Sequence, residues 1–177
     1  MGCCIMKEYD IQRLISTPEL VDAKIKECVS NRVLFKQGID QEEIKGHLLK
    51  AEHNLRFIAE VQTRDFPDWA ITGCYYACYH AALALIQTKG YTSKNHLATI
   101  CILIKEFYKH ELSEEDIMRL SVFLDYKDVL FYVEAKNKRE DAAYSTRTLF
   151  DKKEVEKLRI EAVLFVNKIR NILNRGV

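Results

Sequence analysis

Hydrophobic positions recur every three or four residues over most of the chain, which is the spacing of one face of an α-helix. One such stripe lies between residues 42 and 62 and consists of Ile44, Leu48, Ala51, Leu55, Ile58 and Val61. Another lies near the C-terminus and consists of Val155, Leu158, Ala162, Phe165, Ile169 and Ile172. Charged residues fill the positions between, so each stripe predicts an amphipathic helix that is buried against its neighbours.

Residues that favour helix starts predict where the helices begin. Thr17 followed by Pro18 predicts a helix that runs to about residue 31, because proline suits the first helical turn. At three places a capping side chain stands three residues before an acidic one: Asp40 with Glu43, Ser113 with Asp116, and Asp151 with Glu154. These pairs predict helices over 42–62, over 114–137 and from 152 onward. Residues 126–132 also fit a short strand, but no second strand of comparable quality is present to pair with it.

The stretch GCYYACYHAALAL, residues 73–85, carries no charge and has the spacing of a buried helix. Asp68 is expected to cap this helix, which runs from Trp69 to about residue 89 and is stopped by Gly90. All of its faces are largely apolar, so we expect it to be surrounded by the other helices. The simplest architecture is an all-α, antiparallel bundle of four to five helices. In this division, residues 1–40 form an N-terminal extension with one helix and residues 41–177 form the bundle.

The composition is that of a folded domain, with 48% apolar and 30% charged residues. A net charge of +1 gives no global attraction to nucleic acid, so any such contact needs a local patch. The six cysteines follow no secretory signal, which predicts free thiols in the cytoplasm. No apolar run is long enough to span a bilayer, so no membrane association is expected.

The polar groups of the central segment have several interpretations. Tyr76 and His80 share one helical face and are candidates for ligand binding, whereas a hydrogen-bonded core histidine is the alternative. Cys74 and Cys78 with a histidine could hold a metal ion, but Cys78 and His80 diverge by about 200° around a helix. Cysteines on an apolar face usually act as small hydrophobic residues. No metal and no cofactor is therefore predicted.

Two further segments carry candidate residues. In YTSKNH, Thr92 or Ser93 is expected to cap a helix that runs to about residue 110. Lys94, Asn95 and His96 would then lie in its first turn, where free N–H groups suit phosphate, or they would form an ordinary polar cap. In KNKREDAAYSTR, residues 136–147, Arg139 and Tyr144 could face one cleft, although such charged runs are usually solvated.

The segment 68–96 resembles the HEPN domain, the nucleotide-binding domain of higher eukaryotes and prokaryotes. The residues that carry the resemblance are Tyr75, Tyr76, Ala77, His80, Ala81, Ala82, Gly90, Lys94 and His96. Weaker similarity extends over about residues 44–174 through HLLKAEHNL and REDAAY. The resemblance implies a helical bundle that forms homodimers, with a minimal nucleotidyltransferase as partner in a toxin–antitoxin type of system. It also implies that many members are metal-independent ribonucleases with an Arg-x4–6-His motif.

This sequence departs from that motif, because no arginine is followed by histidine at the required distance. Arg139 matches the family's arginine, but Tyr144 stands where the histidine would be. A tyrosine, with a pKa near ~10, exchanges protons poorly at neutral pH. The sequence therefore favours a dimeric nucleotide- or RNA-phosphate-binding or regulatory module. The alternatives are a weak metal-independent ribonuclease that uses Arg139 and Tyr144, and a purely structural dimeric interaction protein.

Overall fold

A computed structural model describes residues 8–62, 66–122 and 152–176 of the chain. The helices are α1 (Glu8–Ser16), α2 (Pro18–Ser30), α3 (Gln41–Gln62), α4 (Pro67–Gln87), α5 (His96–Phe107) and α7 (Lys152–Asn174). Residues 114–122 are helical as well. Two short strands, β1 (Leu34–Lys36) and β2 (Tyr91–Ser93), complete the described elements. The predicted all-α bundle is confirmed.

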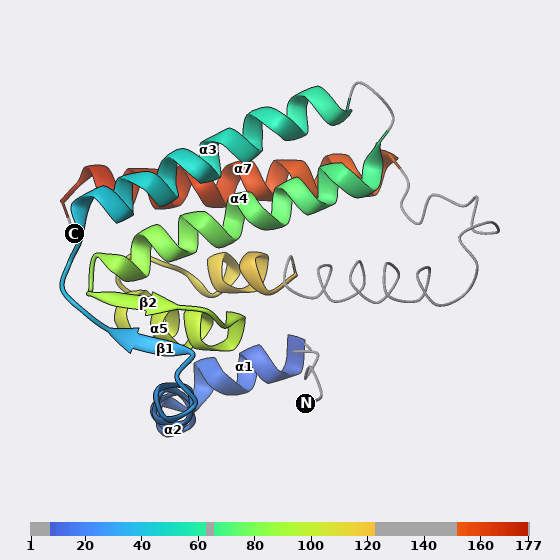
Figure 1. Ribbon diagram of the computed structural model, residues 1–177. Coiled ribbons are helices and arrows are strands. Elements are labelled where there is room, and N and C mark those ends of the chain that lie inside the picture. Colours follow the sequence, from blue (N-terminus) through green and yellow to red (C-terminus); the bar gives the residue numbers. More distant parts are fainter. Residues whose placement is uncertain (1–7, 63–65, 123–151, 177) are drawn as a thin grey trace, which may run out of the picture.

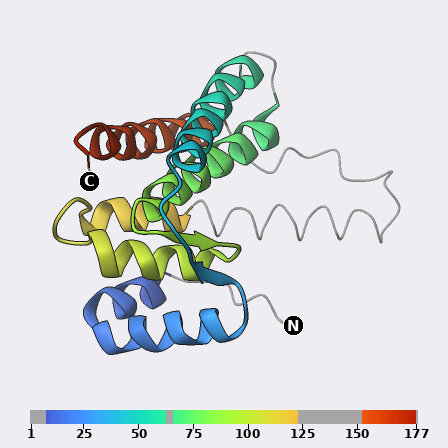
Figure 2. The same cartoon turned by 60° about the vertical axis from the view of Figure 1, so that its left-hand side comes forward.

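The helices stack in layers with α4 near the centre of the molecule (Figure 1). Helix α4 packs against α3, α7 and α5, and α2 packs against α5 on the side away from α4. Turning the molecule shows α1 and α2 as one outer layer, with α3, α4 and α7 on the opposite side of α5 (Figure 2). The stripe predicted for α7 is buried throughout, as expected for a helix packed on a core.

Helix α4 is enclosed along most of its length, which is the predicted arrangement. Its small residues, such as Ala77 and Ala81, are fully buried and let neighbouring helices approach closely. The prediction that every face is covered was wrong in the first half of the helix. There the side chains of Trp69 and Tyr76 are 59% and 43% exposed. The aromatic face of α4 is therefore open at one end and covered at the other.

Gly73 sets the distance between α3 and α4. A Cβ atom at this position would lie 2.7 Å from Cγ1 of Ile58 and 3.2 Å from Cδ1 of Phe57, both on α3. Real Cβ atoms do not approach other atoms as closely as the first distance, so the two helices are in contact through the glycine backbone. Any side chain here would push α3 and α4 apart.

Several helix starts were predicted correctly. Oδ1 of Asp40 accepts hydrogen bonds from the backbone N–H groups of Glu42 and Glu43, at 2.9 and 3.1 Å. Ser113 and Asp116 cap each other reciprocally: the Ser113 N–H donates to Asp116 at 2.9 Å, and the Asp116 N–H donates to Ser113 Oγ at 3.3 Å. These contacts satisfy donors that a helix N-terminus otherwise leaves unpaired.

Two other predicted caps were wrong. Helix α4 starts at Pro67, so Phe66 takes the cap position and Asp68 already lies within the helix. Pro67 determines this start, because proline suits the first helical turn.

Asn95, rather than Thr92 or Ser93, caps α5, since its side chain accepts the N–H of Ala98 at 3.1 Å. Thr92 and Ser93 are unavailable because they belong to β2.

The N-terminal segment is joined to the bundle by a two-stranded antiparallel ribbon that the sequence did not predict. Strand β1 pairs with β2, with Leu34 opposite Ser93 and Lys36 opposite Tyr91. Just before β2, Gly90 has a positive φ of 74°, and its carbonyl accepts the N–H of Gln37 at 2.7 Å, whereas its own N–H donates to the Gln87 carbonyl. A Cβ at Gly90 would lie 2.4 Å from the Gln37 carbonyl oxygen, so only glycine fits.

Helix α1 was also not predicted from the sequence.

A buried glutamine ties this ribbon to α3. The side chain of Gln87, at the end of α4, is 1% exposed. Its Nε2 donates to Oε2 of Glu43 at 3.0 Å, and its Oε1 accepts from Thr92 at 3.2 Å. Gln37 donates to Thr92 at 2.8 Å and to Glu43 at 3.3 Å. These buried polar groups are therefore paired with one another, because an unpaired polar group is costly to remove from water.

The predicted domain boundary near residue 40 stays a prediction.

A helix that spans a bilayer needs about 20 consecutive, mostly apolar residues, and the described helices were predicted not to meet this requirement. None of them is both long enough and apolar enough to cross a bilayer.

Two glycine-to-alanine substitutions test the close contact at Gly73, because they should change the free energy of unfolding in opposite directions. Gly73→Ala should lower the free energy of unfolding, because overpacking typically costs about 1–3 kcal/mol and exceeds the gain in helix propensity of about 1 kcal/mol. Gly46→Ala, within α3, should raise stability by roughly 1 kcal/mol, since a Cβ there meets no atom within 4 Å. Urea unfolding followed by circular dichroism measures both changes. An equal gain for the two variants would contradict the close contact at Gly73.

Candidate functional site

Aromatic and imidazole side chains gather where α3, α4 and α5 meet. We call this group the Tyr–His cluster, and it consists of His47, Tyr75, Tyr76, Tyr79, His80 and His96. Four of its members come from one stretch of α4, where residues three and four apart stack along the helix surface. The helical spacing of the sequence therefore builds most of the cluster, and tertiary packing adds one histidine from α3 and one from α5.

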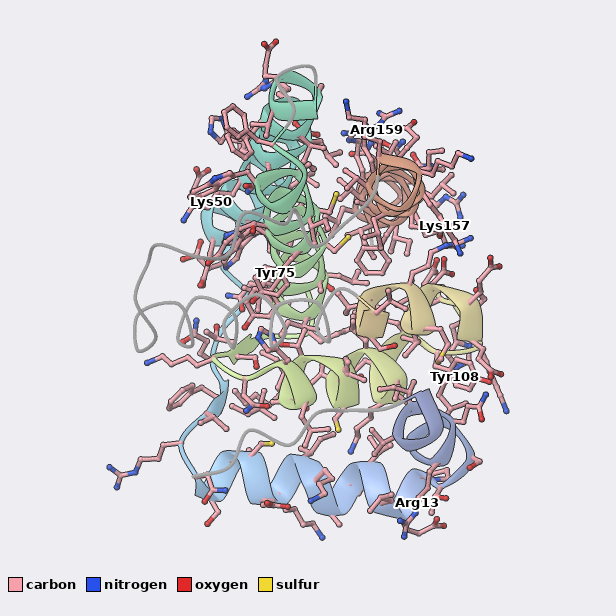
Figure 3. The ribbon with its side chains drawn as sticks, turned by 90° about the vertical axis from the view of Figure 1, so that its right-hand side faces the viewer. Arg13, Lys50, Tyr75, Tyr108, Lys157 and Arg159 are labelled. Carbon is pink, nitrogen blue, oxygen red and sulfur yellow. The ribbon has the colours of Figure 1, made fainter. Side chains whose placement is uncertain are left out.

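One half of the cluster lies between α4 and α5. The rings of Tyr75 and Tyr79 stack with centroids 5.8 Å apart. His96 packs edge-on against both rings, and its Nε2 lies 3.2 Å from the Tyr75 hydroxyl. Because Asn95 caps α5, His96 is the first helical residue and faces α4. Figure 3 shows Tyr75 at the level where α4 passes α5.

The other half of the cluster lies between α3 and α4. Nδ1 of His47 is 3.1 Å from Nδ1 of His80, and the two rings stack with centroids 5.3 Å apart. Oε1 of Glu43 lies 3.8 Å from Nε2 of His47, one helical turn away. His47 was not among the site residues predicted from the sequence. Its spacing of three and four residues from Ile44 and Ala51 was a usable signal, because it places His47 beside the buried stripe.

Contacts between tyrosines join the two halves. Tyr75 and Tyr76 meet edge to face at 4.8 Å, and Tyr79 lies 6.4 Å from His80. The structure thus brings together three of the predicted candidates, Tyr76, His80 and His96. The exposed ring of Tyr76 gives the cluster a side that is open to solvent. The buried ring of Tyr75 forms its floor.

The remaining candidates are placed differently. Nζ of Lys94 lies 5.4 Å above the ring of Phe35, on β1, and so points to the ribbon. The side chain of Asn95 is engaged as the helix cap. Binding of a ligand by these two residues stays a prediction. Arg139 and Tyr144 lie outside the described residues.

The two paired histidines are poor bases. Burial above all, together with the neighbouring His47 and Lys50, lowers the pKa of His80 to about 4. Burial also lowers the pKa of His47, although Glu43 opposes this change. Both imidazoles are therefore neutral at pH 7, and one Nδ1–H donates to the lone pair of the other Nδ1. They offer hydrogen bonds to a ligand rather than positive charge.

The buried cysteines lack the properties of catalytic thiols. Burial raises the pKa of Cys74 and of Cys101 to about 12, and that of Cys78 well above its ordinary value. These thiols stay protonated at neutral pH and pack as small hydrophobic side chains. In residues 8–62, 66–122 and 152–176, no group of three or more His, Cys, Asp or Glu side chains is placed to hold a metal ion.

The structure defines an all-α helical bundle, built around a helix that presents tyrosines and histidines. No model of a known protein family matches the chain. A protein of Methanocaldococcus jannaschii named "Putative toxin MJ0142" is 28% identical over 132 residues, which cover 74% of this chain and 82% of the relative. A "UPF0332 protein" of Archaeoglobus fulgidus is 30% identical over 102 residues, which cover 58% of this chain and 72% of the relative. The chain belongs to the UPF0332 family, which is HEPN-like.

The lowered pKa of His80 predicts how stability depends on pH. An unfolded histidine has its ordinary pKa near ~6.5, so the unfolded chain binds a proton more readily than the folded one. This contribution to stability is present above about pH 6.5 and is lost as the pH falls toward about 4. The neighbouring His47 and Lys50 oppose the protonation of His80, whereas Glu43 favours the protonation of His47.

Melting temperatures at pH 7 and pH 5 measure this effect. The decrease between the two pH values should be smaller in His80→Gln, which cannot be protonated, than in the wild type. His110→Gln, at an exposed position, is the control and should show the wild-type decrease. The same decrease in all three proteins would show that His80 has an ordinary pKa.

Proposed function

We propose that this chain is an HEPN-like component of a toxin–antitoxin type of module and that it binds a nucleotide or RNA phosphate at the Tyr–His cluster. The observation that supports this proposal most directly is the cluster itself. It combines stacked aromatic rings with hydrogen-bonding hydroxyl and imidazole groups, and its side at Tyr76 is open. The name of the relative from M. jannaschii, "Putative toxin MJ0142", supports the type of module.

The chemistry of the cluster suits a nucleotide. A base can stack on the exposed ring of Tyr76, an interaction that typically contributes about 1–3 kcal/mol. The neutral imidazole of His80 and the tyrosine hydroxyls can donate hydrogen bonds to phosphate or sugar oxygens. Lys50, which is exposed on α3 near His80, supplies a positive charge at the edge of the cluster (Figure 3). Stacking and positive charge together are typical of sites that bind single nucleotides or strands.

The proposal includes two protein partners. The family resemblance suggests a second copy of this chain and a minimal nucleotidyltransferase. Exposed aromatic side chains near the start of α4 support a protein contact, since Phe66 is 53% and Trp69 59% exposed. Large aromatic residues are enriched at the centres of protein interfaces.

Nucleotide binding can be measured through thermal stability. A ligand at ten times its Kd adds about 1.4 kcal/mol, which should raise the melting temperature by roughly 3–5 °C in a protein of this size. ATP, GTP and a short single-stranded RNA are the probes. Tyr76→Ala and His96→Ala should abolish the shift. Trp69→Ala is the matched control, because Trp69 is an exposed aromatic residue on the same face of α4 but outside the cluster.

The results separate the proposal from its alternatives. If none of the three probes shifts the melting temperature of the wild type, the binding proposal fails. A shift that survives in Tyr76→Ala and His96→Ala would place binding elsewhere on the molecule. Cleavage of RNA at pH 7 by pure protein, lost in Arg139→Ala, would instead support the weak ribonuclease.

A further inference from the structure

We propose that His47 and His80 form a binding site for a divalent transition metal ion such as Zn²⁺, Ni²⁺ or Cu²⁺, with their two Nδ1 atoms as ligands. The site lies in the seam between α3 and α4, within the Tyr–His cluster. Neutral imidazole is a preferred ligand of these ions. The inference follows from the convergence of the two nitrogen atoms and from the groups that surround them.

The distance between the two nitrogen atoms fits a shared ion. Zinc–nitrogen bonds are about 2.0–2.1 Å long, so two nitrogen atoms on neighbouring coordination positions are separated by about 2.9–3.4 Å. The observed separation of Nδ1 of His47 from Nδ1 of His80 is 3.1 Å. Because the side chains come from two different helices, the packing of α3 on α4 holds this arrangement.

The carboxylate of Glu43 lies next to His47, on the side of the ring away from the proposed ion. When an imidazole binds a metal through Nδ1, its proton lies on Nε2, and this second nitrogen usually faces a carboxylate or carbonyl. Oε1 of Glu43 is 3.8 Å from Nε2 of His47. Glu43 therefore favours the tautomer of His47 that leaves Nδ1 free for the ion. Its charge also favours a cation nearby, whereas exposed Lys50 opposes one.

Metal binding needs no net release of protons from this pair. Without metal, one Nδ1–H donates to the other Nδ1, so one imidazole carries its proton on Nδ1. On binding, that proton is lost from Nδ1 and a proton is taken up on Nε2 of the same ring. Both imidazoles remain neutral, and both Nδ1 lone pairs are directed to the ion.

The remaining coordination positions are open to water or to a ligand. No third His, Cys, Asp or Glu side chain completes the set within the described parts of the chain. This differs from structural zinc sites, in which four protein ligands close the coordination sphere. The His47 side chain is 22% exposed, which gives an ion access to the pair.

The test uses untagged full-length protein titrated with ZnCl₂, NiCl₂ or CuCl₂ and followed by calorimetry. We expect one ion to bind per chain, and binding should weaken at least tenfold in His47→Ala and in His80→Ala. His53→Ala is the matched control, because His53 is an exposed histidine on the same helix as His47. It should bind the ion as the wild type does.

A second measurement observes the ligands directly in the folded wild type. Nitrogen-15 NMR distinguishes the two tautomers of each histidine, and zinc should bring both His47 and His80 to the Nε2–H form. The inference is overturned if no ion binds the wild type, if the alanine variants of the pair bind as the wild type does, or if the imidazole signals of the pair do not change. Because no nucleotide is present, these outcomes do not depend on the function proposed above.

Discussion

The contact of α3 with α4 at Gly73 is the constraint on which the rest of the candidate site depends. With no side chain at this position, the two helices approach so closely that Ile58 and Phe57 pack against the glycine backbone. Farther along the same seam, this packing leaves His47 and His80 within 3.1 Å of each other. A wider spacing would separate the imidazoles, and each would then need another partner in a partly buried position.

Much of the fold could be predicted from local patterns. The apolar stripes of α3 and α7 and the caps at Asp40 and Ser113 depend on neighbours in the sequence, which is why they were predicted. The ribbon was missed because its strands have only three residues each and pair across more than fifty positions. Thr92 and Ser93 show the consequence: both are good capping residues, yet the pairing with β1 decides their conformation.

The candidate site was predictable to the extent that it lies on one helix. Tyr76 and His80 follow from the spacing within α4, and His96 from the start of α5. The partnership of His47 with His80 could not be derived, because thirty-three residues separate the two and only the packing of two helices brings them together. Lys94 lies two positions before His96 in the sequence, but its side chain lies over Phe35, so closeness in sequence does not bring it into the cluster.

The two oxygens of Glu43 face different parts of the molecule. Oε2 accepts hydrogen bonds from Gln87 and Gln37, which hold the N-terminal ribbon, whereas Oε1 faces His47. A single carboxylate thus links the anchorage of the N-terminal ribbon to the orientation of the imidazole ring. The N-terminal ribbon therefore helps to orient the histidine pair, because both depend on the position of the Glu43 side chain.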